Sequence, residues 1–171
     1  MTWRLLALAV CMLICVGAGA ATAADPFARL LAIGGHWQGT SDNGRIVRLK
    51  YAPTARGSVL VETWQEGTAG ETMSVFHRDG NRIMATHYCG QGNQPRLVLE
   101  PGSDDDLVFD YLDATNLADA DASHLVRLRF VIHDDGSLDR IETYRHAGTD
   151  ESSRLHLRRV DERDPASGHG S

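Results

Sequence analysis

The sequence predicts an all-β protein made of about ten short antiparallel strands. Two observations carry this prediction. Apolar stretches with alternating polar residues recur at even spacing between residues 36 and 160, and turn-forming dipeptides such as Asp79-Gly80 and Pro101-Gly102 separate them. No helical pattern of note follows residue 34. Strands spaced this evenly favour a closed barrel or a two-sheet sandwich over a sheet that alternates with helices.

The first 24 residues have the three-part pattern of a secretory signal peptide. Arg4 supplies the positive start, Leu5–Val16 is apolar, and small residues lead to Ala24. The apolar part is shorter than the roughly 20 residues of a membrane span. Neither Cys11 nor Cys15 follows a small residue, as a lipoprotein signal requires. We therefore expect a periplasmic or secreted protein without stable membrane insertion after signal cleavage.

Cleavage leaves 147 of the 171 residues, enough for one domain with its own core. We expect this domain at residues 25–160, followed by a flexible polar tail at 161–171. Arg4 is the only charged residue lost with the leader, so the net charge changes from −6 to −7. A negative charge of this size disfavours nucleic acid and anionic lipid surfaces as partners.

A short helix is expected directly after the leader. Asp25 is suited to cap it and Pro26 is tolerated in its first turn. Gly34-Gly35 is expected to end it. Its apolar stripe is Phe27, Leu30, Leu31 and Ile33.

Ten strands are expected after the helix. Their predicted ranges are 36–40, 46–51, 58–65, 71–78, 81–88, 96–100, 107–112, 125–133, 138–146 and 153–160.

The hairpin around Asp79-Gly80 bears on the orientation of the segment that follows it. A three-residue loop would gather Met73, Val75, Ile83 and Ala85 on one apolar face, a cleaner separation than a two-residue loop gives. We expect this register, with Glu71 opposite His87. His87 and Cys89 would then point into the interior.

The stretch from Leu30 to Thr40 contains Gly35-His36-Trp37 and resembles the opening of calycin barrels. Lipocalins, fatty-acid-binding proteins and nitrobindin-like proteins begin with a short plug helix and then Gly-x-Trp on the first strand. The resemblance implies an antiparallel calycin-like barrel. It also implies that an arginine of the last strand, Arg158 or Arg159, packs over Trp37.

Three further segments resemble an uncharacterised group of exported bacterial lipocalin-like proteins. They are Val61–Trp64, Thr86–Arg96 and Asp113–Leu117. The resemblance covers most of the mature chain and supports the barrel fold. It implies no activity.

Cys89 is the only cysteine of the mature chain, and His87 lies two residues before it. On a strand the two share a face, with Cα atoms roughly 6.5 Å apart. They are candidates for a nucleophilic pair or for two metal ligands, but the sequence places no third orienting group or ligand near them. Packing and polar lining of a pocket is the expected role. A free thiol or an intermolecular disulfide stays open for Cys89.

The loop after Cys89 supplies the stronger recognition candidates. Asn93 and Gln94 both donate and accept hydrogen bonds, and Arg96 suits a carboxylate. At a barrel mouth they would orient a polar ligand group, and Asn116 would contribute from the longest connection. The alternative role for Asn93, Gln94 and Arg96 is to hold the loop in place by hydrogen bonds to backbone, and the alternative for Asn116 is an Asx-turn.

Glu62 shares a strand face with Leu60 and Trp64. An acid on an apolar face needs a partner, and we expect Arg96 to be that partner. Glu62 and Trp64 complete the predicted ligand-binding set, which also contains His87, Cys89, Asn93, Gln94, Arg96 and Asn116.

The leading functional prediction is an exported barrel that binds a small, partly apolar molecule without a cofactor. One alternative is a small periplasmic enzyme that uses Cys89 with His87. Another is a haem- or metal-binding barrel. Nitrobindin-like calycins bind haem through a histidine late in the chain, and His156 would take that place here.

Overall fold

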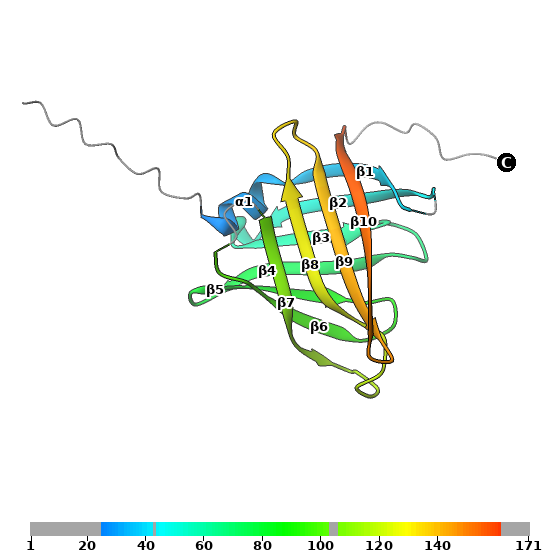
Figure 1. Ribbon diagram of the computed structural model, residues 1–171. Coiled ribbons are helices and arrows are strands. Elements are labelled where there is room, and N and C mark those ends of the chain that lie inside the picture. The colour runs from blue at the N-terminus through cyan, green and yellow to red at the C-terminus, as the bar shows by residue number, and fades with distance from the viewer. Residues whose placement is uncertain (1–24, 43, 103–105, 162–171) are drawn as a thin grey trace, which may run out of the picture.

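The computed structural model describes residues 25–42, 44–102 and 106–161. The predicted leader and all but the first residue of the predicted tail lie outside these ranges. One α-helix precedes ten strands, with a 3-10 turn, η1, at Ala55–Gly57 (Figure 1). The elements are α1 Pro26–Ala32, β1 Gly35–Thr40, β2 Ile46–Thr54, β3 Val59–Trp64, β4 Thr72–Asp79, β5 Arg82–Tyr88, β6 Gln94–Leu99, β7 Asp106–Thr115, β8 His124–Ile132, β9 Leu138–His146 and β10 Thr149–Val160.

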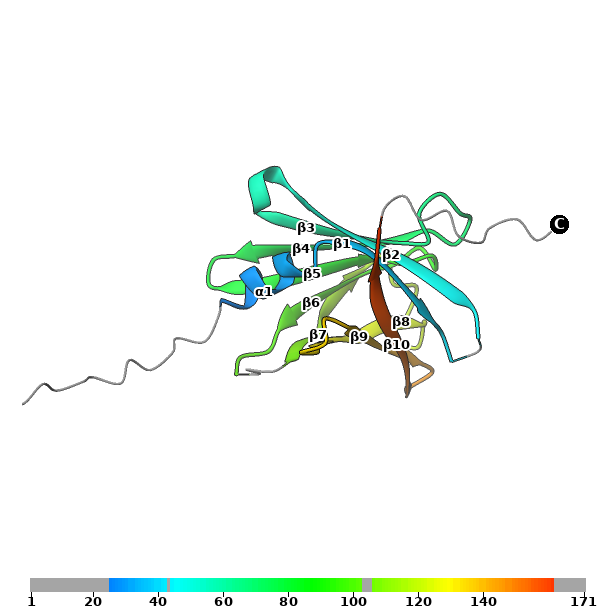
Figure 2. The same cartoon turned by 90° about the horizontal axis from the view of Figure 1, so that it is seen from above.

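The ten strands form a closed antiparallel barrel, which confirms the predicted fold class. Each strand pairs with its neighbour in the chain, and β1 also pairs with β10, so that no strand edge stays open. Helix α1 lies at one end of the barrel in both views (Figures 1 and 2). The turns β1–β2, β3–β4, β5–β6, β7–β8 and β9–β10 lie at the opposite end, called the open end below.

Helix α1 begins and ends where the sequence predicts. The Asp25 carboxylate accepts a hydrogen bond from the Ala28 amide at 3.2 Å, and Pro26 occupies the first turn. Phe27 and Leu30 are buried against the barrel interior. The helix therefore closes this end of the barrel.

The expected arginine–tryptophan contact is made by Arg159. Its guanidinium lies 4.6 Å from the Trp37 ring centroid and donates to the Ala32 and Gly34 carbonyls. The Trp37 indole donates to the Ile33 carbonyl at 2.8 Å. These contacts join the end of α1 to the first and last strands.

Aromatic side chains fill the interior between α1 and the middle of the barrel. Phe76, Phe109 and Phe130 are fully buried and meet edge to face, with ring centroids 5.5–6.4 Å apart. Leu60, Leu97 and other aliphatic side chains surround them. This half of the barrel is a packed apolar core.

The predicted register of the β4–β5 hairpin is wrong. Asp79 pairs with Arg82, so the loop is Gly80-Asn81, and Ser74 lies opposite His87. Strand β4 consequently turns Ser74 and Phe76 inward and leaves Met73 exposed. The prediction failed because it assigned every inward position to an apolar residue.

His87 nevertheless points inward as predicted. It continues the buried alternation of Ile83 and Ala85 along β5. Its partner is Ser74, and not the expected Glu71.

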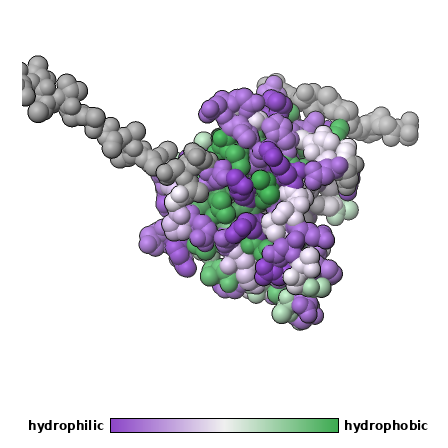
Figure 3. All heavy atoms as spheres, in the orientation of Figure 1, coloured by the Kyte–Doolittle hydropathy of each residue, from purple (hydrophilic) through white to green (hydrophobic). Residues whose placement is uncertain are grey.

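The outer surface is mainly hydrophilic on the face shown in Figure 3, with apolar side chains visible between polar ones. Within the described residues, no helix has the length and apolar character needed to cross a membrane.

Candidate functional site

The interior towards the open end holds a buried arginine between two carboxylates. Arg140 of β9 is 1% exposed, and its Nε and Nη2 each donate to Glu62 of β3 at 2.8 Å. Its Nη1 lies 2.6 Å from Glu142 Oε1. The guanidinium also lies 5.1 Å from the Trp64 ring centroid, within range of a cation–π contact. Strands β3 and β9 are thus joined by charge across the barrel.

A chain of neutral polar groups continues from Glu62 along β4 and β5. The Ser74 hydroxyl lies 3.0 Å from Glu62 Oε1 and 3.0 Å from His87 Nδ1, and the Tyr144 hydroxyl lies 3.2 Å from His87 Nε2. Because Glu62 only accepts, Ser74 donates to it and accepts from His87 Nδ1–H. His87 Nε2 then accepts from Tyr144. This arrangement assigns the neutral Nδ1–H tautomer to His87.

The environment sets the charge states of these groups. Burial alone would raise the pKa of Glu62, but the charge and hydrogen bonds of Arg140 outweigh burial and lower it. Burial lowers the pKa of His87 and raises that of Tyr144, which keeps both neutral. The two carboxylates of Glu62 and Glu142 face the single guanidinium of Arg140, so the cluster carries excess negative charge.

Two buried polar atoms in this cluster lack a well-directed hydrogen bond. Arg140 Nη1 forms an ion pair with Glu142, but the angle does not suit a hydrogen bond. The Tyr51 hydroxyl lies beside Glu62 without good hydrogen-bond geometry. Buried polar groups without a hydrogen-bond partner are uncommon in native proteins.

A hollow of about 530 Å³ opens beside this cluster at the open end. Trp64 borders the hollow and also contacts Arg140. The other lining residues come from the β1–β2 turn, the start of β2 and the β3–β4 loop. They are Ser41, Arg45, Val47, Gln65, Thr68, Ala69 and Gly70.

The structure brings some of the predicted site residues together and separates others. Glu62, Trp64 and His87 belong to the interior cluster, and Cys89 lies at its edge beside Tyr144. The Tyr144 hydroxyl lies 3.2 Å from His87 Nε2, so the nitrogen that the predicted base would use is already bonded to Tyr144. Both ring nitrogens of His87 are already engaged, by Ser74 and Tyr144.

Asn93 and Gln94 hold loops in place by bonding to backbone, as their alternative role predicts, and Asn116 also bonds to backbone. Asn93 Nδ2 donates to the Ser123 carbonyl at 2.8 Å, and Gln94 and Asn116 both donate to the Gly92 carbonyl. Asn93 is buried and its Oδ1 has no hydrogen-bond partner among the described residues. A ligand contact by these amides stays a prediction.

The expected pairing of Glu62 with Arg96 is wrong. Arg96 lies opposite the outward-facing Thr86 and forms a two-pronged ion pair with Asp113 on the outer surface. An outward position on β6 cannot reach an inward position on β3. The correct partner, Arg140, was missed because Arg140, Glu142 and Tyr144 alternate along β9 as a polar face normally does on the outside of a barrel.

His156, the predicted haem ligand of the alternative interpretation, lies on the outer face of β10. Its neighbours Leu155 and Leu157 point into the core, and its Nδ1 lies 2.8 Å from Asp139 Oδ1.

No family model matches the chain, and no curated protein sequence matches it.

Proposed function

We propose that this protein is an exported, lipocalin-like barrel that binds a small, partly apolar molecule at its open end. The observation that carries the proposal is the arrangement of Trp64, which borders the hollow and contacts the buried Glu62–Arg140–Glu142 cluster. Barrel mouths with an apolar wall and a few converging polar groups are typical small-molecule sites. The export part of the proposal rests on the leader pattern at residues 1–24.

The charge of the cluster indicates which polar group the ligand carries. Two carboxylates and one guanidinium leave excess negative charge beneath Trp64. Arg45 is the charged residue that lines the hollow itself. A ligand that reaches past it to the cluster with an ammonium group or another hydrogen-bond donor is favoured there over one with a carboxylate. The apolar body of the ligand would lie against Val47 and the indole of Trp64, which both line the hollow.

A matched pair of probes tests this proposal. Decylamine and decanoate share an alkyl chain and differ in the charge of the head group. Isothermal titration of the purified protein should show tighter binding of decylamine. Trp64→Ala should weaken that binding at least about tenfold. Tyr88→Ala is the control, because Tyr88 is an exposed aromatic residue on the strand that carries His87.

The outcomes separate the parts of the proposal. Tighter binding of decanoate would refute the charge preference. Equal effects of Trp64→Ala and Tyr88→Ala would refute the location. If neither probe binds, and native mass spectrometry of protein isolated from its native host shows no bound molecule, the binding function itself is refuted.

A further inference from the structure

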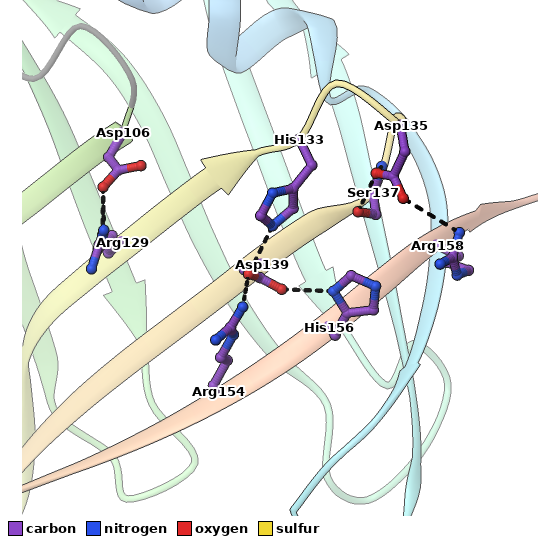
Figure 4. A network of polar contacts seen from close by, with 9 residues as sticks. All are labelled: Asp106, Arg129, His133, Asp135, Ser137, Asp139, Arg154, His156 and Arg158. Carbon is purple, nitrogen blue, oxygen red and sulfur yellow. Dashed lines mark hydrogen bonds and ion pairs between the residues drawn. The ribbon is translucent and has the colours of Figure 1, made fainter.

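A second polar cluster lies on the outer face of the barrel, away from the open end and independent of the proposed ligand site. His133 follows β8, Asp139 is near the start of β9, and His156 lies directly opposite Asp139 on β10. Figure 4 shows the two imidazoles converging on the carboxylate. The β8–β9 turn and the pairing of β9 with β10 therefore bring the three side chains together, with His133 six residues and His156 17 residues from Asp139.

Each imidazole approaches a different oxygen of the same carboxylate. His133 Nε2 lies 2.8 Å from Asp139 Oδ2, and His156 Nδ1 lies 2.8 Å from Oδ1. Asp139 is only 1% exposed, whereas the His133 and His156 side chains are 36% and 48% exposed. The carboxylate is thus held at the base of the cluster, and both imidazoles are open to solvent.

We propose that His133, Asp139 and His156 form a binding site for a divalent transition-metal ion, with Zn²⁺ as its occupant. One potential ligand atom from each residue lies within 4.8 Å of the other two. Ligands of tetrahedral zinc lie about 3.4 Å apart, because each bond is about 2.0–2.1 Å long. Side-chain rotations would have to bring the three atoms from separations of at most 4.8 Å to that spacing. Two imidazoles and one carboxylate suit zinc, and water would complete the coordination.

Arg154 pairs with the same carboxylate. Its guanidinium pairs with Asp139 Oδ2, from the side opposite His133 in Figure 4. The Arg154 side chain is 60% exposed, so it can move into solvent when a cation takes its place. Arg154 and the metal ion would compete for one oxygen, and this competition makes a specific prediction. Removing the arginine should strengthen metal binding.

Zinc titration of untagged, chelator-treated protein tests the site. Isothermal titration should give one Zn²⁺ per chain, and visible absorption with Co²⁺ should report the coordination. His133→Ala and His156→Ala should each weaken zinc binding at least about tenfold. Loss of a residue that only supports a metal ligand already lowers metal affinity by about tenfold or more, and loss of a ligand should cost at least as much. Arg154→Gln should tighten it by up to about tenfold, as Coulomb's law gives for a dication and a guanidinium about 6 Å apart in water.

Two control variants distinguish this site from other metal-binding groups. His77→Ala removes a partly buried histidine whose Nδ1 lies 3.1 Å from the Arg78 carbonyl oxygen. Cys89→Ser removes the thiol of the interior. Both should bind zinc as the wild type does. Absence of a stoichiometric site, wild-type affinity in His133→Ala and His156→Ala, or weaker binding in Arg154→Gln would overturn the proposal.

Discussion

Replacing Arg140 by methionine tests the interior cluster most directly. The change keeps an unbranched side chain of similar length but leaves Glu62 buried with no cation beside it. Removing one partner of a buried ion pair costs about 3–5 kcal/mol, because the remaining charge stays out of water. In a domain of this size such a loss lowers the melting temperature by about 6–20 °C.

Urea unfolding followed by tryptophan fluorescence measures the cost. Arg96→Met is the matched control, because the same change there removes an exposed ion pair with Asp113, and exposed pairs contribute little. The double variant Glu62→Met, Arg140→Met should be more stable than Arg140→Met alone, since it leaves no isolated charge at the position of Glu62.

The pH dependence supplies an independent check. In the wild type the pKa of Glu62 is lowered. The contribution of Glu62 to folding stability is therefore fully present above the unfolded-state pKa of about 4.3, and it is lost as pH falls through the folded-state pKa. Without Arg140, burial raises the pKa of Glu62, so that protonation of Glu62 at lower pH makes the variant more stable instead of less stable. The deficit of Arg140→Met should therefore shrink between pH 7 and pH 5. A deficit below about 1 kcal/mol at pH 7, or one equal at both pH values, would refute the buried ion pair.

Three further predictions concern the rest of the barrel. Gly39→Ala should lower the free energy of unfolding by more than about 3 kcal/mol, because the added Cβ would lie 2.3 Å from a carbonyl oxygen of β10. Gly70→Ala is the control: the added Cβ would have no atom nearer than 3.7 Å, so the same denaturation assay should show little change in stability. Arg159→Met should cost about 1–2 kcal/mol by loss of the Trp37 contact and two hydrogen bonds, and it should shift the tryptophan emission. Burial alone would raise the pKa of Asp139, but hydrogen bonds from the arginine and two histidines around it lower it to about 2. The ionised Asp139 therefore contributes about 1–2 kcal/mol to the free energy of unfolding at pH values above its unfolded-state pKa of about 3.9. The wild type should lose this stability as pH falls from about 4 to 2, and acid titration of Asp139→Asn should not show that loss.

The fold could be predicted because its determinants are local. The capping of α1 by Asp25 depends on residues within one turn, and each hairpin is marked by its own turn residues and strand alternation. The resemblance to calycin barrels predicted that Arg158 or Arg159 of the last strand packs over Trp37, and Arg159 makes this contact. Strand ends were less accurate, since β7 and β10 extend beyond the predicted ranges. Their extra residues are polar except for Ala114, and most of them pair with neighbouring strands.

The candidate site could be predicted only in part, because its partners meet across the barrel. Glu62 and Arg140 are separated by 78 residues, and no local pattern relates them. The inward face of β9 looked polar and was therefore not recognised as interior. The same assumption misplaced β4, where Ser74 and not Met73 faces inward. Hydrophobic alternation assigns faces correctly only where the interior is apolar.

Strand β9 connects the two clusters, and its polar inward face explains why the partner of Glu62 was missed. Asp139 and Arg140 are consecutive, each is 1% exposed, and because side chains alternate along a strand they are buried on opposite faces of the barrel wall. Asp139 is covered from outside by His133, Arg154 and His156, whereas Arg140 is covered from inside by Glu62. A buried charge is costly unless it is paired, so each of these two neighbours needs its own partners from distant strands. The start of β9 is thus stabilised by polar contacts on both faces, and it is the part of the chain where residue polarity alone says least about which face points inward.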